Sequence, residues 1–135
     1  MTEKKLVIAV DFDGVIVSYK DGWQGVDKFG ALVPGAVDVL NRLRNEGHKI
    51  IIHTARVPTK KLVEFLIKNN VPYDAINQNP MDNFGHYYKK LDINPEGVPR
   101  KVVADIYIDD RGITFDGDWY KIYENIQTFK PWEKR

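Results

Sequence analysis

Short apolar runs alternate along this chain with segments in which apolar residues have helical spacing. Four apolar runs have the length of strands: Leu6–Val10, Lys49–His53, Tyr73–Ile76 and Ile106–Ile108. Helical spacing follows Pro34-Gly35 and Pro58-Thr59, and it recurs from Trp119 to Ile126. Strands that alternate with helices favour parallel pairing through right-handed crossovers. The pattern therefore predicts an α/β fold, a three-layer Rossmann-like sandwich around a central, mostly parallel sheet.

Residues 77–100 break this alternation, since they hold three prolines and two glycines. We expect mainly loop there, with one helical turn. The chain shows no repeat and no Gly/Ser linker, and its 135 residues suit one domain over 1–135. A hydrophobic content of 43% supplies enough material for the core of that domain.

Charge and cysteine content exclude several function classes. Twenty basic and nineteen acidic residues give a net charge of +1, so charge indicates neither nucleic acid nor a membrane as partner. The absence of cysteine removes disulfides, Cys-ligated zinc and thiol catalysis. The apolar run before Asp11 is too short for a secretory signal, and no run is long enough to span a membrane. We therefore expect a cytoplasmic protein.

Polar residues follow three of the four predicted strands. Asp11 and Asp13 come after the first strand, and Gly14 then lets the chain bend. The sequence Thr54-Ala55-Arg56 follows the second strand, and Asp109-Asp110 follows the last. Any one of these clusters alone fits an ordinary cap or turn. Parallel strands, however, bring their carboxyl ends to one edge of the sheet, where ligands bind.

Together the clusters predict a site for phosphoryl transfer. Carboxylate pairs repel one another without a cation, and carboxylate oxygens are ligands that Mg²⁺ prefers. A hydroxyl and a cationic side chain at the same edge suit phosphate oxygens. A calcium loop is a weaker explanation of the Asp11–Gly14 stretch, because no further acidic ligands follow at alternate positions.

The order of these motifs resembles that of the haloacid dehalogenase superfamily. The matching elements are DFDGV, an apolar run into Thr54, a lysine, and an apolar run into Asp109-Asp110. The stretch RKVVADIYIDDR is similar to a small subgroup without a cap domain, and IDDR also resembles the phosphatase domain of polynucleotide kinases. The resemblance implies an Mg²⁺-dependent phosphohydrolase that cleaves a phosphate monoester through an aspartyl-phosphate, with its substrate unknown.

The resemblance also implies a role for each matching residue. Asp11 matches the nucleophile and a Mg²⁺ ligand, and Asp13 matches the general acid and base, whose backbone carbonyl reaches the metal. Thr54 matches the phosphate-binding hydroxyl. The remaining assignments are Asp109 and Asp110 to the metal, and Gly14, Ala55, Arg56 and Lys101 to the substrate. An acid at the second position is a feature of the family's phosphatases, so dehalogenation is not expected.

The catalytic lysine departs from the family's pattern, because Lys101 lies only eight residues before Asp109. If all eight residues were strand, Lys101 would lie at the wrong end of the sheet. Either the strand is short and the chain before it reaches the site, or Lys89 or Lys90 supplies the charge. We favour Lys101.

The spacing between the motifs leaves no room for a cap domain, so we expect an open site. Such a site suits a large substrate with an exposed phosphate, or a small one enclosed by an oligomer partner. A flap is predicted at Ser18–Trp23, with Asp21-Gly22 as its turn. Tyr19 and Trp23 either stack on a substrate ring or pack the flap itself, and the sequence leaves both alternatives open.

Two other function classes remain as rivals. A response-regulator receiver domain has similar length and residue types, but there the acidic pair opens the chain and the lysine comes last, which is not the order seen here. The second rival is a non-catalytic phosphate-binding or interaction module on the same fold. Mg²⁺-dependent release of phosphate from an aryl phosphate would separate the enzyme from both.

Overall fold

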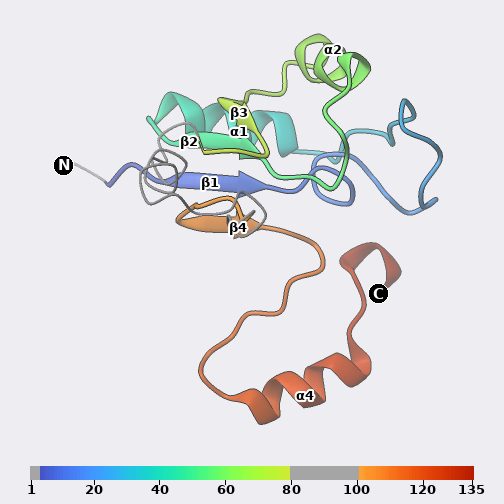
Figure 1. The fold of residues 1–135 in the computed structure, drawn as a ribbon, viewed down its shortest axis with the longest axis vertical. Helices are drawn as coiled ribbons and strands as arrows, with labels where there is room; N and C mark the ends of the chain where they lie inside the picture. The colour runs from blue at the N-terminus through green and yellow to red at the C-terminus, as the bar shows by residue number, and fades with distance from the viewer. Residues whose placement is uncertain (1–3, 80–100) are drawn as a thin grey trace, which may run out of the picture.

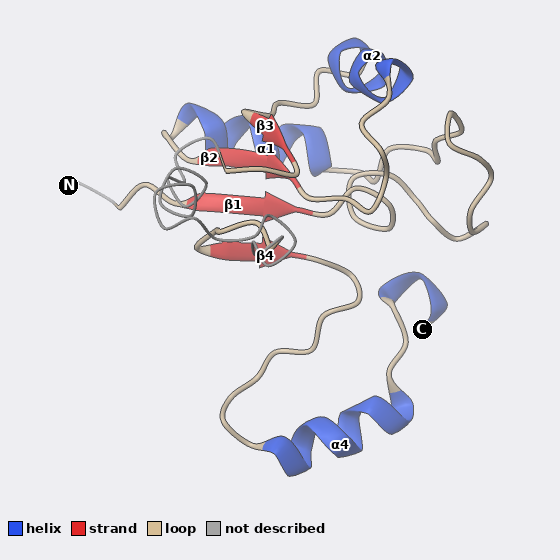
Figure 2. Ribbon diagram, viewed as in Figure 1, coloured by secondary structure: helices blue, strands red, loops and turns tan. Residues whose placement is uncertain are grey.

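A four-stranded parallel sheet forms the centre of the molecule (Figures 1 and 2). The computed structural model describes residues 4–79 and 101–135. The strands are β1 (Val7–Val10), β2 (Lys49–Ile52), β3 (Ala75–Ile76) and β4 (Ile106–Ile108), in the spatial order β3-β2-β1-β4. The predicted α/β class with a parallel, Rossmann-like sheet is confirmed.

The strand register brings the polar clusters to one edge of the sheet. Val10 pairs with both Ile52 and Ile108, so β1, β2 and β4 end at the same level. The backbone N–H of Asp11 donates to the carbonyl of Ile108 at 2.9 Å, and that of His53 donates to the carbonyl of Val10 at 2.8 Å. The residues after each strand therefore begin from fixed, neighbouring positions.

Helices α1 (Ala36–Asn45) and α2 (Lys60–Lys68) contribute to the main hydrophobic core. The helical spacing seen in the sequence places Leu40 of α1 and Leu62 and Leu66 of α2 in this core. The Thr59 hydroxyl caps α2 by accepting from the N–H of Leu62 at 3.2 Å. From the sheet, the alternate residues Ile8, Val10, Ile50 and Ile52 join them.

The opposite face of the sheet carries a smaller buried cluster of Ala9, Ile51 and Val102. Val102 belongs to the segment that leads into β4, and the Tyr107 hydroxyl donates to its carbonyl. This bond fixes the approach to β4, which is only three residues long.

The last part of the chain leaves the sheet after β4 and later contacts the loop that follows β1. Helix α4 (Trp119–Thr128) lies away from the sheet (Figure 1). Asp118 caps it, and it holds no buried residue. The short 3₁₀ helix η2 (Trp132–Lys134) comes back to the body, where the indole Nε1 of Trp132 donates to the carbonyl of Gly14 at 2.6 Å. Both ends of the α4 segment are therefore attached to the sheet domain.

The four strands and the three longer helices that the sequence predicts are all present, with small changes at their ends. Strand β2 ends at Ile52, and β3 is shorter than the predicted Tyr73–Ile76. Asp74 lies outside β3, and its carboxylate accepts from the N–H of Ile50 at 2.8 Å. The predicted loop of residues 77–100 lies mostly outside the described residues. Among the described residues, no helix is long and apolar enough to cross a membrane.

Candidate functional site

Three carboxylates meet where β1 and β4 end. Asp11, Asp109 and Asp110 each offer an oxygen, and these oxygens lie within 4.8 Å of one another. Asp11 follows β1 directly, and its Oδ1 accepts from the N–H of Phe12 at 2.8 Å. The N–H of Arg111 donates to Asp109 Oδ1 at 2.8 Å. The structure thus brings together the nucleophile candidate and the acidic pair, which we call the acidic triad.

The environment of Asp11, above all its burial, raises the pKa of its carboxyl from the ordinary 3.8 to about 7. Burial of the carboxyl is the largest cause, and the neighbouring charges of Asp109 and Asp110 act in the same direction. The hydrogen bond from Phe12 opposes them. Without a cation, the site therefore favours a proton on Asp11 at neutral pH.

The environment of Asp110 fits a metal ligand. Its Oδ1 is buried and has no hydrogen-bond partner among the described residues, which is costly for a carboxylate oxygen. Its Oδ2 lies over Gly14, where an added Cβ would come within 2.3 Å. Gly14 has φ +86°, so glycine is required there both by conformation and by space. A hard cation among the three carboxylates would satisfy the orphaned oxygen.

Gly14 and Thr54 make contacts that the sequence did not predict. The N–H of Gly14 donates to the carbonyl of Val17 at 2.7 Å, and its carbonyl accepts from Trp132. Both backbone groups of Gly14 are thus engaged within the protein. Thr54 is buried, and its N–H donates to Asn77 Oδ1 at 2.8 Å. Asn77 follows β3 with φ 58°, a conformation that asparagine tolerates.

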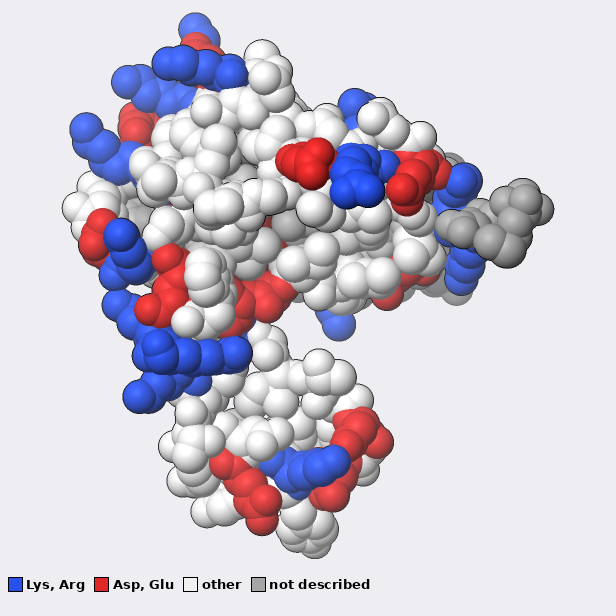
Figure 3. Space-filling model, turned by 180° about the vertical axis from the view of Figure 1, so that it is seen from behind, with Lys and Arg blue, Asp and Glu red and all other residues white. Residues whose placement is uncertain are grey.

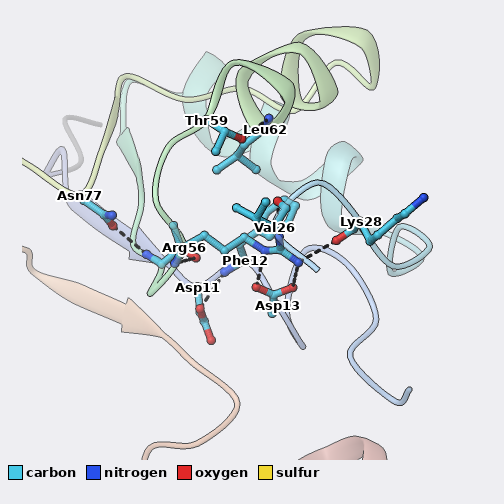
Figure 4. Close-up of polar contacts among 10 residues, drawn as sticks. Asp11, Phe12, Asp13, Val26, Lys28, Arg56, Thr59, Leu62 and Asn77 are labelled. Carbon is cyan, nitrogen blue, oxygen red and sulfur yellow. Dashed lines mark hydrogen bonds and ion pairs between the residues drawn. The ribbon is translucent and has the colours of Figure 1, made fainter. Parts of the chain in front are cut away.

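Arg56 binds Asp13 rather than lying free for phosphate (Figure 4). Its Nε and Nη2 donate to the two oxygens of Asp13 at 2.7 and 3.0 Å. The same guanidinium donates to the carbonyls of Val26 at 3.0 Å and Lys28 at 2.9 Å. The side chain of Arg56 is 4% exposed and that of Asp13 is 19% exposed, so this is a buried, bidentate pair.

Aromatic rings enclose the Arg56 guanidinium. Its central carbon lies 5.6 Å from the ring of Phe12, 5.0 Å from Phe29 and 4.6 Å from Trp23. These distances suit cation–π contacts. Trp23 contacts Arg56 with one face of its ring, and the side chain remains about half exposed to solvent. The guanidinium therefore links Asp13 to Trp23 at the end of the flap and to residues 26–29, which follow the flap.

A cleft of about 410 Å³ opens beside these groups. Its lining joins the predicted site residues to Arg111 and two flap aromatics, and comprises Asp11, Asp13, Tyr19, Trp23, Thr54, Ala55, Arg56 and Arg111. Arg111 was not among the predicted site residues, although its place after the acidic pair was a signal for it.

The flap forms around the predicted turn. The N–H of Gly22 donates to the carbonyl of Tyr19 at 3.0 Å, and Gly22 has φ 71°. At the base of the flap, Val17 bridges Leu32 in antiparallel fashion. Glu133 of η2 accepts from the Ser18 hydroxyl at 2.5 Å and from the N–H of Tyr19 at 2.7 Å. Helix η2 therefore fixes the base of the flap, a contact that no pattern in the sequence predicts.

Lys101 lies outside strand β4, in the segment that leads into it. Its ammonium group is 5.0 Å from the centre of the Tyr107 ring, and that ring lies 6.0 Å from His53. Among the described residues, no ion pair joins Lys101 to the acidic triad. Lys89 and Lys90 lie outside the described residues.

No protein-family model matches this chain. No curated protein matches it either. Among solved structures, that of a conserved protein from Bacteroides thetaiotaomicron is similar, with 30% sequence identity and a TM-score of 0.60. The match covers 92% of this chain and 91% of that one. This chain therefore belongs to the same family as the conserved Bacteroides thetaiotaomicron protein.

Proposed function

We propose that this protein is a Mg²⁺-dependent phosphohydrolase that cleaves a phosphate monoester through an aspartyl-phosphate on Asp11. The observation that carries the proposal is the acidic triad, in which Asp110 Oδ1 is buried without a partner among the described residues, at the edge of a cleft shared by Asp11 and Thr54. A buried carboxylate oxygen without a partner favours a bound cation. The Thr54 hydroxyl and the Arg111 side chain in the cleft suit an anion next to that cation.

Asp11, Asp109 and Asp110 would hold Mg²⁺, together with the backbone carbonyl of Asp13. When bound, the ion supplies charge stabilisation to the phosphoryl oxygens. Its charge also favours the ionised form of Asp11, against the burial that raises the pKa of this group.

The chain's own residues then divide the reaction into two steps. An Asp11 oxygen attacks phosphorus, the bond to the ester oxygen breaks, and Asp13 gives that oxygen a proton. Asp13 next takes a proton from water, whose oxygen attacks phosphorus and breaks the bond to Asp11, releasing inorganic phosphate. Thr54 donates its hydroxyl hydrogen to a phosphoryl oxygen, and Arg111 offers positive charge at the rim of the cleft.

Both oxygens of Asp13 accept hydrogen bonds from the Arg56 guanidinium. At least one of these bonds must therefore break during the first step, so that Asp13 can give its proton to the leaving oxygen. The proposal therefore implies that esters with poor leaving groups need Asp13 most. Asp13→Asn should slow alkyl phosphates by on the order of 10²–10⁴ and affect p-nitrophenyl phosphate much less. Equal losses on both substrates would remove the general-acid role.

The main experiment is phosphate release by Asp11→Asn in Mg²⁺, with a substitution of the exposed residue Asp27, Asp27→Asn, as the matched control. We expect a loss on the order of 10³-fold or more for Asp11→Asn and no loss for Asp27→Asn. When turnover of a substrate with labelled phosphate is stopped by acid, the wild-type protein should carry label as a hydroxylamine-sensitive acyl phosphate. Full activity in excess EDTA, or near-native activity of Asp11→Asn, would contradict the proposal.

Alanine substitutions, made one at a time, identify which lysine supplies the positive charge. A positive charge near the triad is needed because three carboxylates and a phosphate dianion surround one divalent ion. We expect Lys101→Ala to reduce turnover strongly. If turnover is unchanged while Lys89→Ala or Lys90→Ala abolishes it, the charge comes from the preceding segment instead.

A further inference from the structure

Helix α4 has an apolar face that nothing in the described structure covers. Trp119, Tyr123 and Ile126 share one side of the helix and are 71%, 70% and 60% exposed. The helix has only ten residues, and isolated helices of this length are unstable in water. Packing of the apolar face is the usual source of helix stability in proteins. Something must therefore cover α4.

The attachments of the chain hold α4 away from its own sheet. On one side the segment leaves β4, and on the other η2 is anchored by Trp132 on Gly14 and by Glu133 on Ser18 and Tyr19. Among the described elements, α4 packs against no helix and no strand. Figure 3 shows open space between the lobe that contains α4 and the rest of the molecule.

The same chain presents an uncovered apolar groove of about 280 Å³ between α1 and the sheet. Its lining includes Val39, Leu40 and Leu43 of α1, together with Val10 and Ile108. Val39 is 48% exposed and Ile108 is 39% exposed. Core residues of α1 and β1 therefore lie beside a surface that remains open to solvent along β4.

We propose that α4 of one copy occupies this groove on a second copy of the chain, and that the second copy returns the same contact. The two surfaces are complementary because each is apolar, and each chain carries one of each. A reciprocal exchange satisfies both surfaces in both copies and closes as a two-fold dimer. The inference is independent of the proposed phosphatase activity.

The area that such an exchange would bury is that of a small, reversible interface. An aromatic side chain buries about 150–250 Å² when fully enclosed. Covering about half of Phe115, Trp119, Tyr123 and Ile126 removes roughly 300–500 Å² from the helix. The groove loses a smaller area, because lining residues such as Val10 and Leu40 are themselves buried. Two reciprocal contacts then bury about 800–1,200 Å² in total, which is the area of a small interface, so we expect a dimer that dissociates on dilution.

The first test is the molar mass of the full chain by light scattering over a concentration series. We expect a dimer, and Ile126→Lys should weaken association on the order of 10²-fold by placing a charge in the apolar contact. Thr128→Lys is the matched control, because it adds the same residue to the opposite, exposed side of α4. A wild-type chain that is monomeric at every concentration overturns the proposal, as do equal effects of the two variants.

The second test uses the absence of cysteine in this chain. The single variants Val39→Cys and Ile126→Cys change exposed residues, so each should fold, and circular dichroism checks that it does. After the two proteins are mixed and oxidised, a disulfide-linked peptide pair joining residues 39 and 126 requires α4 of one copy in the groove of another. Absence of this pair from the oxidised mixture overturns the proposal. A double variant that carries both cysteines then shows where α4 lies: a disulfide within one chain means that α4 folds onto its own sheet.

Discussion

Substitution of Arg56 by methionine tests the buried ion pair at the centre of the site. Methionine keeps much of the side-chain volume, but it leaves the Asp13 carboxylate and the carbonyls of Val26 and Lys28 without their donors. Removing one partner of a buried ion pair typically costs about 3–5 kcal/mol. Because Arg56 is 4% exposed and Asp13 is 19% exposed, we expect this range for Arg56→Met.

Urea unfolding followed by circular dichroism measures the cost. For a domain of 135 residues, about 3–5 kcal/mol corresponds to a loss of about 10–20 °C in Tm. The matched control is Arg44→Met, which breaks an ion pair with Asp74 in which the arginine is 50% exposed. Exposed pairs contribute about 0–1 kcal/mol, so this variant should be nearly as stable as the wild type.

A double-mutant cycle then isolates the pair itself. Asp13→Asn should cost less than Arg56→Met, since the carbonyls of Val26 and Lys28 and three aromatic rings still hold the guanidinium. The double variant should cost less than the sum of the single variants by about 1–3 kcal/mol. If Arg56→Met and Arg44→Met differ by less than about 1 kcal/mol, the reasoning from burial is wrong.

The remaining predictions concern the acidic triad. Because the pKa of Asp11 is raised from 3.8 to about 7, the metal-free folded protein keeps a proton that the unfolded chain has lost, so its free energy of unfolding should fall as pH rises across this interval. Urea titrations in EDTA check this, and the slope should be absent from Asp11→Asn. Gly14→Ala should cost at least about 1–3 kcal/mol and weaken Mg²⁺ binding measured by calorimetry, because its Cβ would meet a triad carboxylate. Gly22→Ala is the control, since it shares a positive φ but has open space, and unchanged Mg²⁺ affinity in Gly14→Ala would refute the steric argument.

The sheet and the meeting of the acidic residues followed from local patterns in the sequence. Apolar runs such as Ile106–Ile108 identify strands, and parallel topology then brings the residue after each strand to a common edge. This logic holds for Asp11 and Asp109 because each follows its strand directly. It gave no pairing for Arg56, whose partner Asp13 is 43 positions away and lies under the flap.

Side-chain partners of this kind depend on how loops pack, which periodicity does not encode. A signal for Arg56 was nevertheless present: an arginine after a buried strand, with Phe12, Trp23 and Phe29 available to enclose it. The contact of Trp132 with Gly14 spans 118 positions, and nothing near either residue indicates it.

The hydrogen bond from Trp132 to Gly14 gives the acidic site an internal optical label. The chain has three tryptophans, and the other two lie over Arg56 and on the exposed face of α4. A variant with phenylalanine at positions 23 and 119 would keep only the indole that donates to the Gly14 carbonyl. Any ligand that shifts the turn between Asp11 and Val17 should change the emission of that indole, so occupancy of the site can be followed by intrinsic fluorescence without an added dye.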